Sequence, residues 1–358
     1  MKHLSPSAFS GAGQLVGSAL AKILGRPSND FGKRFLMDAY QTYDAATFDS
    51  AGAFLIGELE RLDPMLHEPL ISVTWSRDID LRTDVTMADT SSSYILTAFA
   101  ASGTPAPGGI SWASPNNTTL PRFQLDGRKI VSPMDLWEHE VSYTITDLIQ
   151  SQATNRPIDT QMISGLNWKD QMDTDQLVYI GDSSKGTTGL LNSSFVVNTG
   201  NVVNGASASP LWSSKTPAEI LKDVNDLLVS VWAASGWVAP PTKLLLPPTQ
   251  FGLISTQIIS SGAGNISILK YIRENNILTA QFNIQLEIQP VKWAVASYRG
   301  AGSDRMVAYS QKPDYIRFPK VPMVPMAVQY AGVWIKVPYY AKLGVLEVVY
   351  PEAIGYRD

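Results

Sequence analysis

The chain contains no cysteine among its 358 residues, and only 17% of them are charged. The absence of cysteine excludes disulfide bonds and thiolate metal ligands. The low charge leaves much of the surface neutral, as in chains whose outer faces are partly covered by neighbouring subunits. Hydrophobic residues make up 44% of the chain, so the sequence can form a large core of two or three domains.

Long apolar runs are also lacking. The apolar stretch at residues 15–24 is interrupted by Ser18 and Lys22 and is too short to span a bilayer. We therefore expect no membrane partner. The net charge of −4 argues against a basic groove for nucleic acid, so any contact with DNA is expected to be non-specific.

Metal-ligating and catalytic patterns are weak. The three histidines, His3, His67 and His139, are too far apart in sequence to form a local ligand pair. Ser267 and Lys270 match the Ser-x-x-Lys pattern of acyl-serine enzymes, but the companion elements of those enzymes are missing. No nucleophile elbow, phosphate loop or dinucleotide fingerprint occurs. We predict no catalytic residue, no metal, no cofactor and no enzymatic activity.

Charges are unevenly distributed along the chain. The first 35 residues contain five basic residues and one acidic residue, whereas residues 135–182 contain nine acidic residues and two basic ones. Segments of opposite sign favour attraction between neighbouring subunits, although each charge also fits a solvated surface. If neighbours pair in this way, salt should weaken intermediate assemblies.

The first third of the sequence predicts an arm, a strand and a long loop. Alternation from Ile71 to Asp80 predicts a strand. Residues 83–128 are rich in Ser, Thr, Pro and Gly and cannot form their own core. Trp112, Leu120 and Phe123 indicate an ordered loop that needs another subunit as partner. Within it, Asp126-Gly127 predicts a local turn, and replacing residues 85–122 with a Gly-Ser connector should block assembly without unfolding the chain.

A strand and a long helix are predicted next. Apolar residues alternate from Trp137 to Ile145, and the helix should begin with Pro157 in its first turn. Its second half, Lys169 to Gln176, is polar on most sides, so we expect this half to leave the core. Asp170 and Asp173 in this half lack the glycine-containing loop of a calcium site.

The clearest local signal is the capping box Thr216-Pro217-Ala218-Glu219, which predicts a helix as far as Gly236. A short buried strand at residues 243–246 and a helix from Pro248 should follow. We predict another helix over residues 265–274, strands from Gln281, a turn at residues 299–304 and a strand at residues 306–309. The aromatic residues of the last third are expected in the sheet core and at interfaces: Trp293, Tyr298, Tyr309, Tyr315, Tyr330, Trp334, Tyr339 and Tyr340.

Several segments in this order carry a family resemblance. The long helix runs into Tyr179-Ile180-Gly181-Asp182 and then Gly189-Leu190-Leu191-Asn192, and the chain closes with Val337-Pro338-Tyr339-Tyr340 and Val348-Val349-Tyr350-Pro351. Together these segments resemble the major capsid proteins of tailed bacteriophages with the Hong Kong 97-type shell fold. The resemblance covers roughly residues 140–358.

The resemblance implies an α+β fold with a set division of the chain. The implied parts are an N-terminal arm (1–65), the start of the peripheral domain (66–82), an extended loop (83–128), the peripheral domain with its long spine helix (129–214), an axial domain (215–305) and the return strands of the peripheral domain (306–358).

The resemblance also implies the function. Such a chain would assemble through hexamers and pentamers into an icosahedral head that encloses double-stranded DNA, with portal, scaffolding and cement proteins as partners. Assembly would take place in the bacterial cytoplasm, and the protein would reside in the virion capsid. Candidate assembly residues are Arg77, Trp112, Leu120, Phe123, Asp170, Asp173, Gly181 and Asp182.

Alternatives and two details stay open at this point. An encapsulin-type cellular compartment shares the fold, and a carbohydrate-binding or enzymatic domain built on the C-terminal strands is a different class. Electron microscopy of the purified protein separates them by particle size. The Lys, Asn and Glu of a self-formed isopeptide crosslink cannot be aligned here, so we expect none. Because Met1 is present, we expect an unprocessed N-terminus and a separately encoded scaffold.

Overall fold

The computed structural model describes residues 70, 72–101, 123–153, 158–259 and 266–358. The described residues from 72 onward belong to one compact unit. The predictions for the arm at residues 1–65, for Trp112, Leu120 and Pro157, and for the basic residues near the N-terminus lie outside the described residues.

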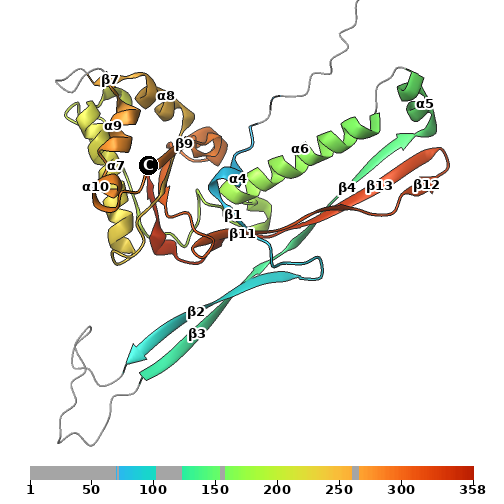
Figure 1. Cartoon of the computed structure of the whole chain (residues 1–358), viewed down its shortest axis with the longest axis horizontal. Helices are drawn as coiled ribbons and strands as arrows, with labels where there is room; N and C mark the ends of the chain where they lie inside the picture. The colour runs from blue at the N-terminus through green and yellow to red at the C-terminus, as the bar shows by residue number, and fades with distance from the viewer. Residues whose placement is uncertain (1–69, 71, 102–122, 154–157, 260–265) are drawn as a thin grey trace, which may run out of the picture. The chain divides into compact units, whose positions relative to one another are not determined.

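The described chain contains a five-stranded sheet (Figure 1) whose central strands are buried on both faces. Its order is β5 (Thr199–Gly200), β15 (Ile354–Arg357), β10 (Met306–Tyr309), β6 (Lys243–Leu246) and β9 (Glu287–Pro290). Successive side chains of a strand point to opposite faces, so Leu245 and Val307 enter one hydrophobic core while Leu244 and Ala308 enter another. Burial on both faces explains why β6 and β10 are almost continuous apolar runs.

Four helices cover one face of this sheet and complete the second of these cores. They are α7 (Pro217–Ala234), α8 (Pro248–Thr256), α9 (Ile268–Glu274) and α10 (Ile277–Phe282). The predicted capping box is present: the Glu219 carboxylate accepts the Thr216 N–H at 2.8 Å. Hydrogen bonds from the backbone N–H groups of Thr216 and Ala206 lower the pKa of Glu219. The predicted strand at residues 243–246 and the helix from Pro248 are confirmed.

A six-stranded sheet packs against the long helix. The path is β1 (Asp80–Arg82), β11 (Ile316–Pro325), β13 (Trp334–Leu343) and β12 (Gln329–Ala331), with β14 (Glu347–Val348) on β11 and β4 (Asp135–Thr144) on β13. The predicted strand before the long helix is therefore confirmed as β4. After it come α5 (Ile145–Ala153) and α6 (Ile158–Tyr179). Trp137 of β4 donates its indole N–H to Asp173 of α6 at 2.9 Å.

Two hairpins and several short elements complete the described chain. The longer hairpin joins β2 (Ser91–Ala101) to β3 (Phe123–Pro133), and the shorter joins β7 (Ile258–Ile259) to β8 (Ile266–Ser267). The short helices are α4 (Trp75–Asp78), α11 (Ala296–Arg299), η1 (Ser183–Lys185), η2 (Trp212–Ser214), η3 (Lys292–Ala294) and η4 (Pro351–Ala353).

The segment predicted as return strands, residues 306–358, divides between the two sheets. β11, β13 and β14 join β4 in the six-stranded sheet, whereas β10 and β15 join β6 and β9 in the five-stranded sheet. The end of the described chain is thus part of the sheet that the helices α7 to α10 cover. The predicted turn at residues 299–304 is confirmed, with Gly300 in the left-handed region at φ 70°.

The predicted strand from Ile71 to Asp80 is wrong, because the segment contains the helical turn α4 before the short strand β1. Trp75 and Ile79 are both buried in the first core. Residues four apart lie on the same side of a helical turn as well as of a strand, so the alternation could not separate the two. The same ambiguity misplaced Phe282, which ends α10, while the predicted strands from Gln281 reduce to β9.

Two further predictions need correction. Asp126-Gly127 is not a turn: both residues lie inside β3, opposite Ala98 and Thr97 of β2. Pairing along the whole hairpin overrides the local turn preference of this dipeptide. The helix predicted over residues 265–274 begins later, at Ile268, where the Ser267 hydroxyl accepts the Lys270 N–H.

The polar second half of α6 does not leave the core as predicted. The buried residues of α6 are Leu166, Asp170, Thr174, Asp175, Val178 and Tyr179, whereas Met162 in the first half is 37% exposed. Asp170 binds Lys320 of β11 at 2.7 Å, and Asp175 accepts the Thr74 and Trp75 N–H groups at the start of α4. Polar residues are buried here because each carboxylate has partners on other elements.

Candidate assembly surfaces

One face of the β2–β3 hairpin is apolar and exposed. Residues directly opposite in an antiparallel pair share a face, and Phe99 lies opposite Leu125. These two side chains are 69% and 64% exposed. The apolar residues on this face are Ile95, Phe99, Phe123, Leu125 and Val131, all more than half exposed. The rings of Phe99 and Phe123 stack with centroids 5.6 Å apart.

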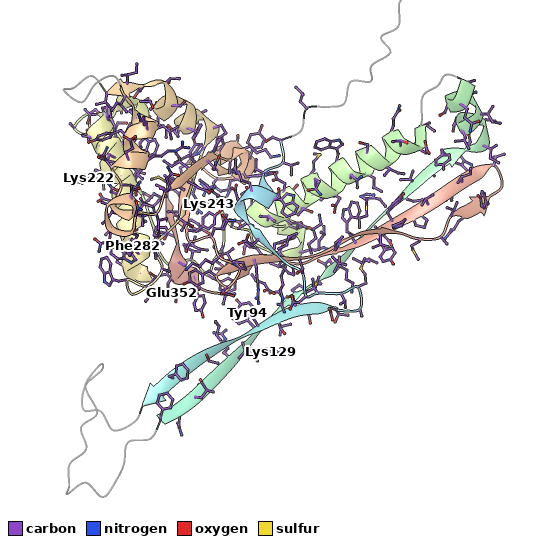
Figure 2. The ribbon with its side chains drawn as sticks, in the orientation of Figure 1. Tyr94, Lys129, Lys222, Lys243, Phe282 and Glu352 are labelled. Carbon is purple, nitrogen blue, oxygen red and sulfur yellow. The ribbon has the colours of Figure 1, made fainter. Side chains whose placement is uncertain are left out.

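The opposite face of the hairpin is more polar. Asp126 lies opposite Ala98, and Arg128 lies opposite Leu96. Figure 2 shows the hairpin side chains, with Tyr94 on β2 and Lys129 on β3 labelled. Lys129 adds a charge to the apolar face beside Ile95. A contiguous apolar face with polar residues beside it is typical of a protein interaction site.

The turn after α6 explains the Gly-Asp and Gly-Leu-Leu-Asn segments. Gly181 has φ 82°, in the left-handed region that favours glycine. Asp182 then caps η1 by accepting the Ser184 N–H at 2.9 Å, and the hydrogen bonds from the Ser184 hydroxyl and N–H lower the pKa of Asp182. The chain next runs back along the helix end, where the Leu190 N–H donates to the Val178 carbonyl at 2.8 Å.

Gly189 makes this close return possible. A Cβ atom at this position would lie 2.4 Å from the Tyr179 carbonyl carbon and 2.5 Å from the Ile180 nitrogen. Leu190 and Leu191 follow immediately and are fully buried in the first core. The segment therefore fixes the end of α6 to the core through backbone contacts.

We expect Gly189→Ala to destabilise the folded chain by about 3 kcal/mol or more, because the backbone atoms of α6 cannot move away cheaply. Gly165→Ala on the same helix is the control. A Cβ at Gly165 would meet nothing within 4 Å, so this change should stabilise the helix by about 0.5–1 kcal/mol. Urea unfolding of the unassembled chain measures both, and equal stabilities for the two variants would contradict this account of the turn.

The predicted assembly residues are distributed over several elements. Asp170 is buried against Lys320 of β11. Asp173 pairs with Lys169 at 2.6 Å and also accepts the Trp137 indole N–H. Arg77 forms two hydrogen bonds to the buried Asp78 carboxylate, and this contact raises the pKa of Arg77. Phe123 is the one described member on the apolar face of the hairpin.

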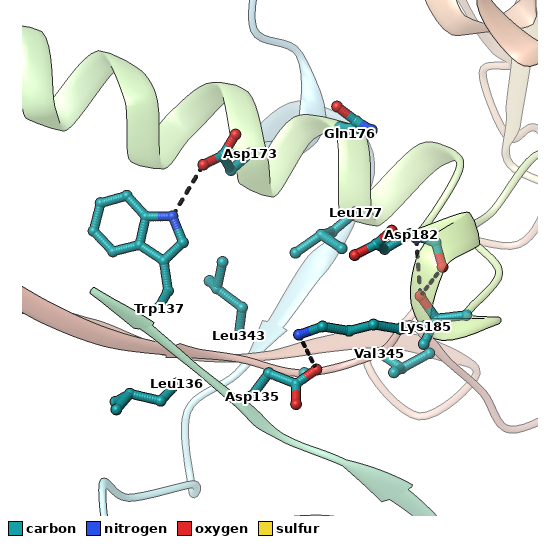
Figure 3. A pocket seen from close by; sticks show the side chains of 12 residues that line it. Asp135, Leu136, Trp137, Asp173, Gln176, Leu177, Asp182, Lys185, Leu343 and Val345 are labelled. Atoms are coloured by element: carbon teal, nitrogen blue, oxygen red, sulfur yellow. Dashed lines mark hydrogen bonds and ion pairs between the residues drawn. The ribbon is translucent and has the colours of Figure 1, made fainter. Parts of the chain in front are cut away.

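A cavity of about 220 Å³ lies between α6, the start of β4 and the end of β13 (Figure 3). Asp135, Asp173 and Asp182 contribute carboxylates to its lining, beside Trp137 and Lys185. Lys185 pairs with Asp135 at 2.8 Å, while the other two carboxylates hold the contacts described above. All three carboxylates are thus engaged by neighbouring groups of the same chain.

The sequence matches the family model for the major capsid protein over residues 108–358. The chain belongs to this family. Three solved structures illustrate the likeness in fold. The capsid of Myoviridae phage XM1 is 19% identical with a TM-score of 0.68, covering 84% of this chain and 97% of that chain. The capsid of a native GTA particle is 13% identical with a TM-score of 0.58, covering 88% of this chain and 99% of that chain. A chain from the structure of Microbacterium phage Oxtober96 is 10% identical with a TM-score of 0.54, covering 86% of this chain and 98% of that chain.

A comparison with curated protein sequences gave no match. The family match identifies a major capsid protein, a structural component of the virion that forms the phage shell. The fold is the mixed helix and strand fold of phage capsid proteins. These findings confirm the predicted function of a phage shell protein, and they do not favour the encapsulin, carbohydrate-binding or enzymatic alternatives.

No described helix is long and apolar enough to cross a membrane. Within the same residues, no cluster of His, Asp or Glu side chains is arranged to hold a metal ion.

Most of the apolar hairpin face is not evident from the sequence. Ile95, Phe99, Leu125 and Val131 were not predicted as interface residues, since the Ser, Thr and Ala around them are typical of a surface loop. The sequence shows no clear alternation here, because Tyr94 and Leu96 flank Ile95. Only the register of β2 against β3 places all five apolar residues on one face.

Proposed function

We propose that this major capsid protein assembles through hexamers and pentamers into the icosahedral head of a tailed phage, which encloses double-stranded DNA. The proposed division of the chain is that of the Hong Kong 97-type fold, with α6 as the spine helix and the β2–β3 hairpin as the extended loop. We further propose that the protein has no enzymatic activity. Assembly would take place in the bacterial cytoplasm, with portal, scaffolding and possibly cement proteins as partners.

The observation that carries this proposal is the exposed apolar face of the hairpin. Phe99 and Leu125 lie on β2 and β3 outside both hydrophobic cores. Burial of apolar side chains provides most of the free energy of protein association, so we propose that this face binds a second copy of the chain. Neutral surfaces and low total charge are compatible with extensive contact of this kind.

Fewer acidic residues are available for ionic contacts between subunits than the charge of residues 135–182 suggested. Asp170 and Asp175 are buried and already paired inside the chain. Asp135 and Glu140 also have intrachain partners, Lys185 and Lys336. Attraction between the remaining acidic groups and the basic N-terminal segment of a neighbour stays a prediction, which the salt dependence of capsomer yield would test.

Polar substitutions on the apolar face test the proposal. Phe99→Ser with Leu125→Thr should reduce shell formation at least tenfold, because the apolar area available to a second copy is lost. The matched control is Ala98→Ser with Asp126→Asn, which changes the paired residues on the other face. Light scattering and electron microscopy follow shell formation. Equal yields from both double variants would exclude this face as an assembly surface.

A further inference from the structure

The hairpin is joined to the sheet through a buried carboxylate, that of Glu347 on β14. Its side chain is fully buried, and its two oxygens face two arginines from neighbouring strands. Arg82 lies 3.0 Å from one oxygen, and the Nε of Arg317 lies 2.7 Å from the other. The third partner is the Ser92 hydroxyl at the start of β2, which donates to the same carboxylate.

The same group of contacts extends over the first residues of β2. Arg82 donates to the Ser92 hydroxyl at 2.8 Å and to the Ser93 carbonyl at 3.0 Å. The Tyr94 hydroxyl donates to the carbonyl of Val348, the residue after Glu347, at 3.1 Å. Residues 92–94 are therefore bound to β1 and β14 by side-chain contacts, in addition to the covalent connections of the hairpin.

Farther along the hairpin the contacts are different. Among the described residues, no hydrogen bond or ion pair joins residues 95–101 or 123–130 to an element outside the hairpin. At about 3.3 Å per residue, an 11-residue strand is about 36 Å long. The distance from residues 92–94 to the far end is about 26 Å, so a tilt of roughly 10° at these residues would move the far end by roughly 5 Å. A small change of angle at the base of the hairpin therefore causes a large displacement of the apolar face.

We propose that Glu347 is a latch that fixes the direction in which the hairpin leaves the sheet. The carboxylate holds Arg82 and Arg317 in place. Ser92 binds the hairpin to this carboxylate, and Tyr94 binds it to the backbone of β14. Hydrogen bonds to charged groups are shorter and stronger than neutral ones. Such bonds can hold the base of a long hairpin in a fixed orientation. The consequence for assembly rests on the proposed function, in which the apolar face binds a second copy.

The latch can be opened from the hairpin side without leaving a buried charge unpaired. Ser92→Ala with Tyr94→Phe removes the two hydroxyls that bind the hairpin, while Glu347 keeps both arginines. The matched control is Ser91→Ala at the exposed neighbouring position. Circular dichroism should give the same folded content for both variants and the unchanged chain.

The direct readout is a distance measured in the full, unassembled chain. Because the chain has no cysteine, spin labels can be attached to Thr97→Cys on the hairpin and Asp314→Cys before β11. We expect double electron–electron resonance to show a distance distribution at least twice as wide in the Ser92→Ala/Tyr94→Phe variant as in the control. An unchanged width would overturn the latch, whatever the outcome for assembly.

Assembly gives the second readout. With the latch open, particles should form with irregular or incomplete shells, whereas loss of the apolar face should prevent their formation. Regular shells from the latch variant, despite a widened distance distribution, would overturn the proposal that the latch directs the hairpin for assembly. The distance measurement does not require assembly, so it decides the latch separately from the proposed function.

Discussion

Replacing residues 95–129 with an Asn-Gly turn is expected to abolish shell formation and leave the rest of the chain folded. Tyr94 and Ile130 are directly opposite in the hairpin, so a two-residue type I′ turn can join them without changing the register. The replacement removes Ile95, Phe99, Phe123 and Leu125 and keeps the contacts of residues 92–94. It is a more conservative cut than removal of residues 85–122, which would take away β2 and leave β3 without its partner strand.

The folded part should be stable because neither hydrophobic core includes a residue of the removed segment. We expect the melting temperature to change by no more than about 3 °C, as for surface changes in a chain of this size. Sedimentation velocity measures assembly, under conditions in which the unchanged chain forms shells. Normal shells from the shortened chain would mean that the hairpin is not an assembly element, and an unfolded product would mean that it belongs to the core.

Asp175→Ala is expected to destabilise the chain by about 3–5 kcal/mol, the cost of breaking a buried charged network. Asp175 accepts the Thr74 and Trp75 N–H groups at 2.9 and 3.0 Å and the Trp293 indole N–H at 2.6 Å. Lys292 lies 3.3 Å away. Alanine would leave two backbone donors at the start of α4 and an indole N–H without their acceptor.

This loss is a large share of the roughly 5–15 kcal/mol that stabilises a typical domain. The control is Asp173→Ala, two residues earlier on α6, where the carboxylate is partly exposed and binds Lys169 and Trp137. That change should cost about 1 kcal/mol. Chemical denaturation of the unassembled chain compares the two. Similar losses of unfolding free energy in both variants would show that the buried contacts of Asp175 stabilise the chain no more than the exposed contacts of Asp173.

The sequence predicted best those elements that depend on neighbouring residues. The capping box at Thr216 and Glu219 acts within one helical turn, so its pattern was sufficient to predict α7. Gly181 and Gly189 were recognised through a family resemblance. The structure explains why glycine is needed at both positions: Gly181 has a left-handed backbone conformation, and Gly189 approaches the backbone at the end of α6 closely. Those geometries are not visible in a residue pattern.

Errors occurred where a pattern had two meanings or where a partner was distant in sequence. Trp75 and Ile79 fit a strand and a helical turn equally well, and only the contact with Asp175 identifies the start of α4. Asp170 appeared to be a surface charge because Lys320 is 150 residues away. The apolar hairpin face likewise depends on the pairing of β2 with β3, which sequence spacing alone does not determine.

Cryo-electron microscopy of particles formed by the unchanged chain, with its scaffolding protein where one is required, tests the central claim most directly. We expect closed icosahedral shells in which Phe99 and Leu125 are buried against a second copy of the chain. Shells in which these side chains face solvent, or a purified protein that forms only small oligomers under all assembly conditions, would contradict the account.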